Sequence, residues 1–198
     1  MADGCLGIVV ADVTGHGVGP ALLMAETRAY LRTLALNAED TGDILTRANR
    51  VLAEDVDFER FVTVILARLD PRSQSLDYAS AGHPCGYVLD AAGHVKARLK
   101  RLGVPLGIQP DVDYASSPVI SLSAGDIVLL LTDGIEEAMS PDNAFFGVDQ
   151  VLDVVRAHSK RTAGEIVEAL YRAVGEFSHG LPQLDDLTVV VVKVKPSG

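Results

Sequence analysis

Three acidic positions in this sequence stand directly beside long apolar runs. They are Asp12 after residues 6–11, Asp133 after residues 127–131, and Asp185 with Asp186 before residues 187–192. We expect each apolar run to form a buried strand, because β-branched and other large apolar residues dominate it and a turn bounds it. A carboxylate at the end of a buried strand is costly to desolvate unless a cation, hydrogen-bond donors or an open cleft receives it.

These carboxylates are expected to meet at one edge of the core. In an antiparallel arrangement the end of one strand lies beside the start of its neighbour. Oxygen ligands without an accompanying His/Cys set favour Mg²⁺ or Mn²⁺ over zinc, and two such ions can activate water for attack on a phosphoryl group. The pattern therefore predicts a site for metal-dependent phosphoester hydrolysis built from Asp12, Asp133 and Asp185.

Each of these segments also has a plain structural interpretation. Asp133-Gly134 alone is more often a turn, and Asp185-Asp186 alone is more often a solvated loop before a strand. His16, between two glycines, fits a turn, an acid–base group or a residue that supports the metal ligands. His83, before Pro84, fits a backbone bend as well as a direct role. The coincidence of three carboxylate segments with three apolar strands is what favours the functional interpretation.

Composition narrows the class of protein. The chain has 198 residues, of which 48% are hydrophobic, and this suits one globular domain. Its formal net charge is −10 and it has no Lys/Arg cluster, which argues against nucleic-acid binding. No apolar run reaches the roughly 18–20 residues that span a bilayer, so we expect no membrane segment. Cys5 and Cys85 are expected to be buried free thiols of a cytoplasmic protein.

The hydrophobic periodicity alternates between strand and helix patterns along the chain. We expect helices at residues 19–36 and 42–55, then strands at residues 61–67, 75–79, 86–89, 95–99 and 119–122. Two helices follow between residues 148 and 177, and Thr162 with Glu165 forms a capping box for the second. Strands buried on both faces need cover on both faces. The pattern therefore predicts an α+β fold, a four-layer α-β-β-α sandwich of mainly antiparallel sheets flanked by helix pairs.

Five short motifs occur in order along almost the whole chain. They are residues 12–17 (Asp-Val-Thr-Gly-His-Gly), 81–84 (Ala-Gly-His-Pro), 105–107 (Pro-Leu-Gly), 132–134 (Thr-Asp-Gly) and 185–188 (Asp-Asp-Leu-Thr). Together they closely resemble the PPM (PP2C-like) serine/threonine phosphatases, in particular the bacterial branch of sporulation stage II E and sigma-factor-regulator phosphatases. Each motif is weak alone, but five in order are highly specific.

The resemblance implies a β-sandwich flanked by helix pairs and a metal-dependent enzyme. Such an enzyme hydrolyses phosphoserine or phosphothreonine with a metal-activated water and without a covalent phospho-enzyme. Carried over by motif, Asp12 bridges two Mn²⁺ or Mg²⁺ ions, the Val13 carbonyl binds the second ion, and Asp133 and Asp185 complete the first.

The remaining polar residues of the motifs receive weaker roles. His16, His83 and Asp186 are candidates for supporting the metal ligands or contacting substrate. The general-acid role is not transferred to His16, because its spacing differs from the Asp-Gly-His of eukaryotic relatives.

The resemblance also implies partners. The usual substrate in this branch is a phosphorylated anti-sigma-factor antagonist, a small STAS-domain protein that is then free to bind the anti-sigma factor. An upstream sensory or receiver domain is expected in the parent protein, and a homodimer is left open.

The sequence departs from the family at its start. Family members carry an upstream strand with a Gly-Gly-Asp-type motif whose carboxylate ligates the second metal, whereas this sequence begins at the following turn, Asp3-Gly4. We therefore expect residues 1–198 to be a single, N-terminally truncated phosphatase domain that lacks the first strand. Two alternatives stay open, a weak or inactive PPM-fold interaction module and a small-molecule phosphoester hydrolase. No Gly-x-x-x-x-Gly-Lys loop supports the latter.

Overall fold

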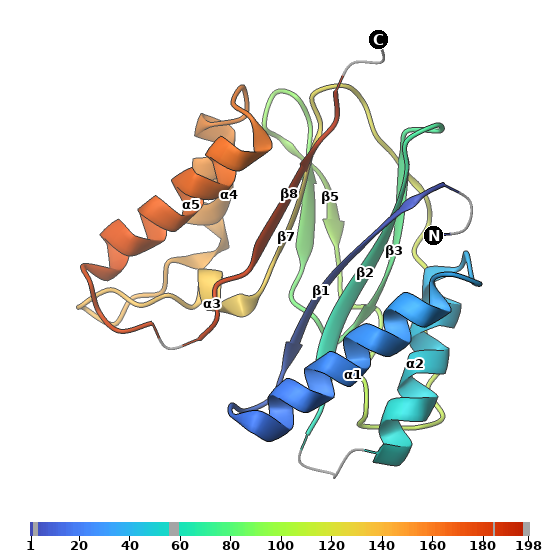
Figure 1. The fold of residues 1–198 in the computed structure, drawn as a ribbon. Coiled ribbons are helices and arrows are strands. Elements are labelled where there is room, and N and C mark those ends of the chain that lie inside the picture. Colours follow the sequence, from blue (N-terminus) through green and yellow to red (C-terminus); the bar gives the residue numbers. More distant parts are fainter. Residues whose placement is uncertain (2–3, 56–59, 184, 196–198) are drawn as a thin grey trace. The chain divides into compact units, whose positions relative to one another are not determined.

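The computed structural model describes residues 1, 4–55, 60–183 and 185–195 (Figure 1). The turn expected at Asp3-Gly4 includes Asp3, which lies outside these residues. The chain folds as two compact units, and each is described by itself. The first unit comprises Met1–His83 with Lys100–Leu122, and the second comprises Pro84–Leu99 with Ser123–Gly198.

The first unit is an antiparallel sheet with two helices packed on it. Its strand order is β1-β2-β3-β6, and its elements are β1 (Leu6–Val13), α1 (Val18–Leu34), α2 (Thr41–Asp55), β2 (Val62–Asp70), β3 (Ser75–Ala81) and β6 (Ile120–Ser121). Alternate β2 residues Val62, Val64 and Leu66 join one apolar core with Leu45 and Leu52 of α2. The period of two places these strand residues on the face that the helices cover.

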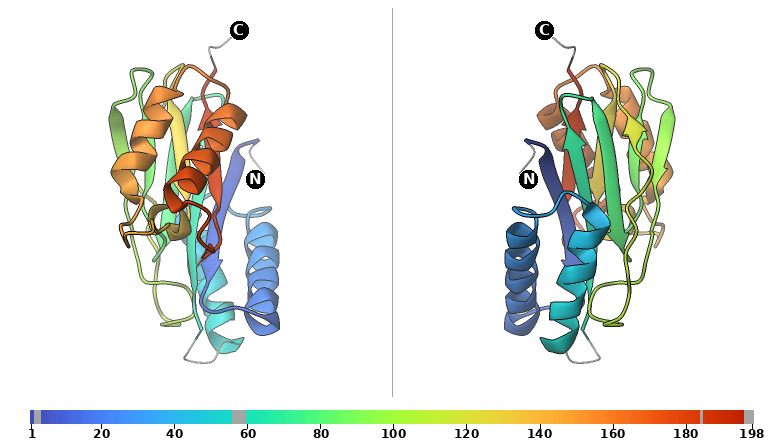
Figure 2. Two further views of the ribbon diagram at one scale, coloured as in Figure 1. Left: turned by 90° about the vertical axis from the view of Figure 1, so that its left-hand side faces the viewer. Right: turned by 90° about the vertical axis from the view of Figure 1, so that its right-hand side faces the viewer.

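The second unit repeats this plan with a different order of elements. Its strand order is β5-β4-β7-β8, and its elements are β4 (Gly86–Leu89), β5 (Val95–Leu99), β7 (Ile127–Leu131), α3 (Asp133–Glu136), α4 (Gly147–Ala157), α5 (Ala163–Ser178) and β8 (Val189–Lys193). Helices α4 and α5 lie beside β7 and β8 (Figures 1 and 2). Leu129 and Leu131 of β7 share a core with Val155, Ile166 and Leu170 of these helices.

The predicted fold class is confirmed, since the chain forms two antiparallel sheets that each carry helices. The strands expected at residues 86–89, 95–99 and 127–131 have the expected bounds. The capping box of α5 is also present, with Thr162 and Glu165 bonding each other's backbone N–H.

Four details of the prediction are wrong. Strand β1 was expected to be buried, but Leu6 and Val9 are 53% and 42% exposed, because β1 is an edge strand with one neighbour. Strand β8 is half-buried for the same reason. Cys5 is buried and forms no disulfide among the described residues, as expected, but Cys85 is only half-buried. Helix α3 was not expected, and it begins at Asp133, where an Asp-Gly turn was the plain interpretation.

Among the described residues, no helix has both the length and the apolar character that crossing a membrane requires.

Candidate metal centre

Two of the predicted carboxylates lie together in the second unit. Asp133 is the first residue of α3, directly after β7, and Asp185 lies in the loop before β8. Because β7 and β8 are antiparallel, with Leu131 opposite Val189, the end of one strand meets the start of the other. Asp133 and Asp185 each offer a carboxylate oxygen, and these two oxygens lie within 4.8 Å of each other.

The two carboxylates differ in their surroundings. The Oδ1 atom of Asp133 is buried and has no hydrogen-bond partner among the described residues. Asp185 is exposed, and its Oδ1 accepts a hydrogen bond of 2.8 Å from the backbone N–H of Asp186. A buried carboxylate oxygen without a donor is unfavourable unless a cation or water binds it. The oxygen-only pair therefore fits a hard divalent cation such as Mg²⁺ or Mn²⁺.

A threonine fixes the backbone around this pair. The buried Thr132 hydroxyl donates to the Asp186 carbonyl at 2.9 Å and accepts from the Thr188 N–H at 3.0 Å, and the Thr132 N–H donates to the Thr188 carbonyl at 3.1 Å. The backbone of Asp186 also approaches Gly134 closely. A Cβ at Gly134 would lie 2.5 Å from the Asp186 carbonyl oxygen, so only glycine fits there. Asp186 thus supports the pair through its backbone, while its side chain is exposed.

In the first unit, Asp12 lies inside β1 and not after it. The β1–β2 ladder continues through Asp12, which is opposite Thr63, to Val13, which is opposite Val62. Asp12 and Val13 are both half-buried. The strand is longer than expected because Val13 still pairs with β2, and the turn begins only at Thr14.

The turn that follows β1 is held by its own threonine. The Thr14 N–H donates to the Phe61 carbonyl at 3.1 Å, and the Thr14 hydroxyl accepts from the Phe61 N–H at 3.1 Å. Gly15 and Gly17 have φ of 84° and 96°, values that favour glycine, and Gly17 caps α1. His16 between them is exposed.

His83 is fully buried and lies on the strand face that carries Asp12. Its Nδ1 is 2.9 Å from the Thr63 hydroxyl, and its carbonyl accepts a hydrogen bond of 3.2 Å from Arg101 Nε. Residues that are opposite each other in an antiparallel ladder point to the same face. His83 therefore contacts Thr63, whose side chain shares a face with Asp12. The simple backbone bend considered for His83 does not describe this side-chain contact.

The motifs at residues 81–84 and 105–107 pack against each other. Gly82 has φ of 70°, and a Cβ on it would lie 2.4 Å from the Pro105 Cγ. Leu106 exchanges two backbone hydrogen bonds with Val62, at 2.8 and 3.0 Å. Because Val62 is opposite Val13, these two motifs brace the end of β1.

Three polar residues that hold the predicted motifs in place within their own units were given no individual role in the sequence analysis. They are Thr63, Thr132 and Asn49. Asn49 is fully buried in α2; its Oδ1 accepts from the Gly107 N–H at 2.9 Å, and its Nδ2 donates to the Gln109 carbonyl at 2.7 Å. A polar residue at an apolar position of a helix or strand pattern was the signal available for Asn49 and Thr63. Asp12 and the Asp133–Asp185 pair belong to different units.

Comparison with known proteins gives consistent matches along the chain. A family model described as Stage II sporulation protein E (SpoIIE) matches residues 2–195. Phosphoserine phosphatase RsbU of Bacillus subtilis is 28% identical over 190 residues, covering 96% of this chain and 56% of that protein. Protein IcfG of Synechocystis is 27% identical over 221 residues, covering 97% of this chain and 34% of that protein. The chain thus spans about half or less of the length of these relatives.

Solved structures match the same fold. The SiaA-PP2C domain of Pseudomonas aeruginosa is 26% identical, with a TM-score of 0.83 over 96% of this chain and 76% of that chain. A structure of the PP2C phosphatase domain and a regulatory fragment of SpoIIE from Bacillus subtilis is 21% identical, with a TM-score of 0.81 over 95% of this chain and 54% of that chain.

Proposed function

We propose that this chain, which belongs to the stage II sporulation protein E family, is the catalytic domain of a metal-dependent protein serine/threonine phosphatase. The observation that carries the proposal is the Asp133–Asp185 pair, in which a buried carboxylate oxygen has no hydrogen-bond donor among the described residues. A cation bound to this pair would compensate the buried carboxylate oxygen, which has no hydrogen-bond donor among the described residues.

The proposal assigns the metal ligands as follows. Asp133 and Asp185 would hold one Mn²⁺ or Mg²⁺ ion, Asp12 would be a ligand shared between this ion and a second one, and the Val13 carbonyl would be a ligand of the second. Bound divalent cations would activate water and stabilise charge on the phosphoryl oxygens. The half-buried place of Asp12 on β1 and the contact of the buried His83 with Thr63, which is opposite Asp12, support the part of Asp12 in the proposal.

The protein's own groups orient these ligands. The Thr132 hydroxyl and the close approach at Gly134 fix the loop that carries Asp185 against the start of α3. Outer hydrogen bonds of this kind hold metal ligands in place and tune their affinity.

The substrate is proposed to be a phosphoserine protein. Two curated relatives are named phosphoserine phosphatases, RsbU and RsbP of Bacillus subtilis. The resemblance to the sigma-factor-regulator branch points further to a phosphorylated STAS-domain antagonist as substrate. It also points to regulation by an upstream sensory or receiver domain of the parent protein.

The test combines metal binding with a substrate panel. We expect Mn²⁺ to bind in calorimetry, and phosphate release from a phosphorylated STAS-domain protein to require Mn²⁺ and stop with a chelator. Nucleotides in the same assay are expected to be poor substrates. Metal binding without hydrolysis of any substrate would favour an interaction module, a preference for nucleotides would favour a small-molecule hydrolase, and absence of metal binding would refute the proposed centre.

A further inference from the structure

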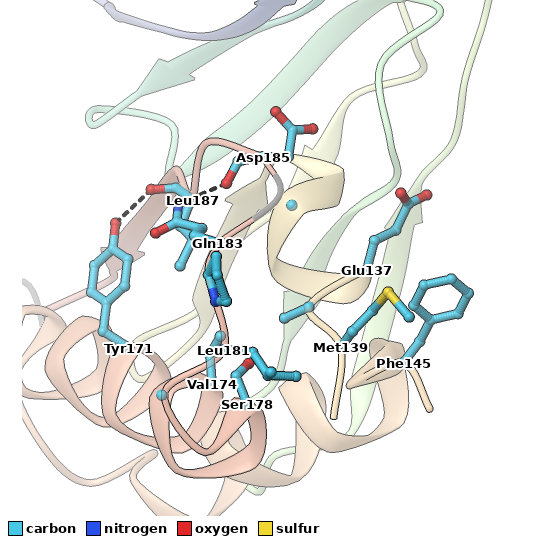
Figure 3. A pocket seen from close by; sticks show the side chains of 14 residues that line it. Glu137, Met139, Phe145, Tyr171, Val174, Ser178, Leu181, Gln183, Asp185 and Leu187 are labelled. Atoms are coloured by element: carbon cyan, nitrogen blue, oxygen red, sulfur yellow. Dashed lines mark hydrogen bonds between the residues drawn. The ribbon is translucent and has the colours of Figure 1, made fainter. Parts of the chain in front are cut away.

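A pocket of about 530 Å³ lies in the second unit, next to the acidic pair. The residues after α3, the second half of α5 and the loop before β8 form its walls (Figure 3). Its apolar lining comes from Met139, Phe145, Val174, Leu181, Pro182 and Leu187. Its volume lies within the range of ligand-binding pockets, which are mostly apolar with a few polar groups.

The pocket is continuous with the carboxylate pair. Gly134 and Asp185 line it, and Asp133 directly precedes Gly134. In Figure 3 the carboxylates of Asp185 and Glu137 lie above the apolar side chains of Leu181, Met139 and Phe145. A segment whose phosphate is held beside Asp133 and Asp185 therefore places its neighbouring residues over this pocket.

The wall of the pocket is held by hydrogen bonds. The Tyr171 hydroxyl of α5 donates to the Leu187 carbonyl at 3.0 Å, and Gln183 Nε2 donates to the Asp185 carbonyl at 2.6 Å. Apolar side chains nevertheless remain uncovered, since Phe145 is 60% and Leu181 44% exposed. Clustered exposed apolar side chains around a formed pocket mark a place where another molecule binds.

We infer that this pocket binds a large apolar side chain (Leu, Ile, Met or Phe) that lies within a few residues of the phosphoserine in the protein substrate. The inference rests on the proposed phosphatase function and adds a sequence preference to it. The apolar wall of the pocket favours an apolar side chain of the substrate. Because the pocket is continuous with the acidic pair, this side chain belongs to the same substrate segment as the phosphoserine. The exposed carboxylate of Glu137, which is not among the proposed metal ligands, lines the pocket and disfavours an acidic residue at the same substrate position.

The test uses phosphoserine peptides that differ at a single position. Leu, Ala and Asp are placed in turn at each of the four positions on either side of the phosphoserine, and kcat/KM is measured with Mn²⁺. We expect one position at which Leu is preferred over Ala by about tenfold or more and Asp is worst, as for apolar side chains in an enzyme pocket. Equal kcat/KM for all three residues at every position would overturn the inference.

A pair of glycines in α5 supplies the variant and its control. A Cβ added at Gly175, which lines the pocket, or at Gly164, near the start of α5, meets no atom within 4 Å. Gly175→Leu therefore adds an apolar side chain to the pocket wall at a position where its Cβ is free of contacts, and we expect it to bring the Leu/Ala ratio of kcat/KM close to one. Gly164→Leu makes the same change outside the pocket and is expected to keep the wild-type ratio. A wild-type ratio in Gly175→Leu would place the apolar preference elsewhere.

Two further measurements distinguish a failure of the pocket inference from a failure of the phosphatase proposal. Mn²⁺-dependent hydrolysis of p-nitrophenyl phosphate by the wild-type chain, without any peptide preference, would leave the phosphatase proposal intact and refute the pocket's role. Binding of peptides with a non-hydrolysable phosphonate, followed by fluorescence anisotropy, gives the same Leu/Ala comparison without turnover. Tighter binding of the Leu peptide that Gly175→Leu abolishes would support the pocket even where hydrolysis is slow.

Discussion

The two units fasten their acidic segments with a threonine at a strand end, but they do so differently. In the first unit Thr14 comes two residues after Asp12 and makes its hydrogen bonds with one residue, Phe61. In the second unit Thr132 comes directly before Asp133 and bonds both Asp186 and Thr188. The first threonine closes a turn, whereas the second joins two segments that each carry a carboxylate.

This difference shows two ways of placing a charged group at a core edge. Asp12 is placed by strand register, because the β1–β2 ladder runs through it to Val13. Asp133 lies just beyond its ladder, which ends at Leu131, so side-chain hydrogen bonds and the glycine contact at Gly134 take over. We therefore expect the position of the carboxylates in the second unit to be more sensitive to single side-chain substitutions than the position of Asp12 in the first.

The largest effect is expected when the carboxylate of Asp133, whose Oδ1 is buried, loses its charge. Asp133→Asn keeps the shape of the side chain but replaces a carboxylate ligand by a neutral amide. We expect the Mn²⁺-dependent phosphatase rate to fall at least about a hundredfold, and the rise in Tm that Mn²⁺ causes in the wild type to disappear.

The control for this change is Asp142→Asn, which removes a charge from an exposed position of the same unit. It is expected to keep both the rate and the Mn²⁺-induced rise in Tm. An Asp133→Asn protein whose Tm still rises with Mn²⁺ would show that Asp133 is not a metal ligand.

The threonines give the next largest effect and test the comparison directly. Thr132→Val removes the hydroxyl of a buried side chain that bonds both the Asp186 carbonyl and the Thr188 N–H, so we expect a loss of about 1–3 kcal/mol in the free energy of unfolding. Thr14→Val is expected to cost less, because water reaches the half-buried turn. Urea unfolding of both variants measures the difference.

Thr27→Val serves as the reference for losing a buried hydroxyl. The Thr27 hydroxyl donates to the Leu23 carbonyl within its own helix, at 2.8 Å, so its removal leaves only a helical carbonyl with one donor fewer. If Thr14→Val destabilised the protein as much as Thr132→Val, the proposed distinction between the two threonines would be wrong.

A smaller effect on activity is expected from the contact opposite Asp12. Thr63→Val removes the hydroxyl that His83 Nδ1 contacts at 2.9 Å, while the side-chain shape and the β1–β2 pairing are kept. We expect about a tenfold lower rate, as for residues that support metal ligands, together with weaker Mn²⁺ binding in calorimetry. The neighbouring Ser80→Ala removes a buried hydroxyl of β3 and is expected to leave Mn²⁺ affinity unchanged. Equal Mn²⁺ affinity in Thr63→Val and the wild type would exclude a supporting role.

The elements of the fold were largely predictable because their signals are local. The apolar run at residues 127–131 and the capping box at Thr162 each determine an element without reference to the rest of the chain. Whether a strand lies at the edge of its sheet cannot be predicted from local sequence. The residues of β1 predict a buried strand, and only its edge position in the sheet exposes Leu6 and Val9.

The candidate centre was predictable in its acidic residues but not in their supports. Asp133 and Asp185 could be identified from the sequence because they stand beside apolar runs. The antiparallel pairing of β7 and β8 then brings them together. The supports are single polar residues inside apolar patterns, such as Thr63 and Asn49, whose partners are distant in sequence. Only the tertiary structure shows that His83, separated by 20 residues from Thr63, contacts its hydroxyl.

The smallest effect is expected on the pH dependence of stability, and it concerns two buried tyrosines, one in each unit. Burial raises the pKa of Tyr87, in the second unit, and of Tyr114, in the first, from the ordinary 10.0 to about 12. The folded state thus favours the neutral hydroxyls. Their contribution to stability is fully present below pH 10 and is lost as the pH rises from 10 through 12.

Phenylalanine at either position removes one ionising group, so each variant is expected to lose less stability than the wild type between pH 10 and 11. The two differ at pH 7. Tyr114 donates to the Val104 carbonyl at 2.9 Å, so Tyr114→Phe is expected to cost about 1 kcal/mol there. Tyr87→Phe keeps the ring 6.0 Å from the Arg98 guanidinium and is expected to cost less. Thermal melting at pH 7, 10 and 11 measures both effects, and a Tyr87→Phe protein with the full alkaline loss of the wild type would show that the second unit does not keep this hydroxyl neutral.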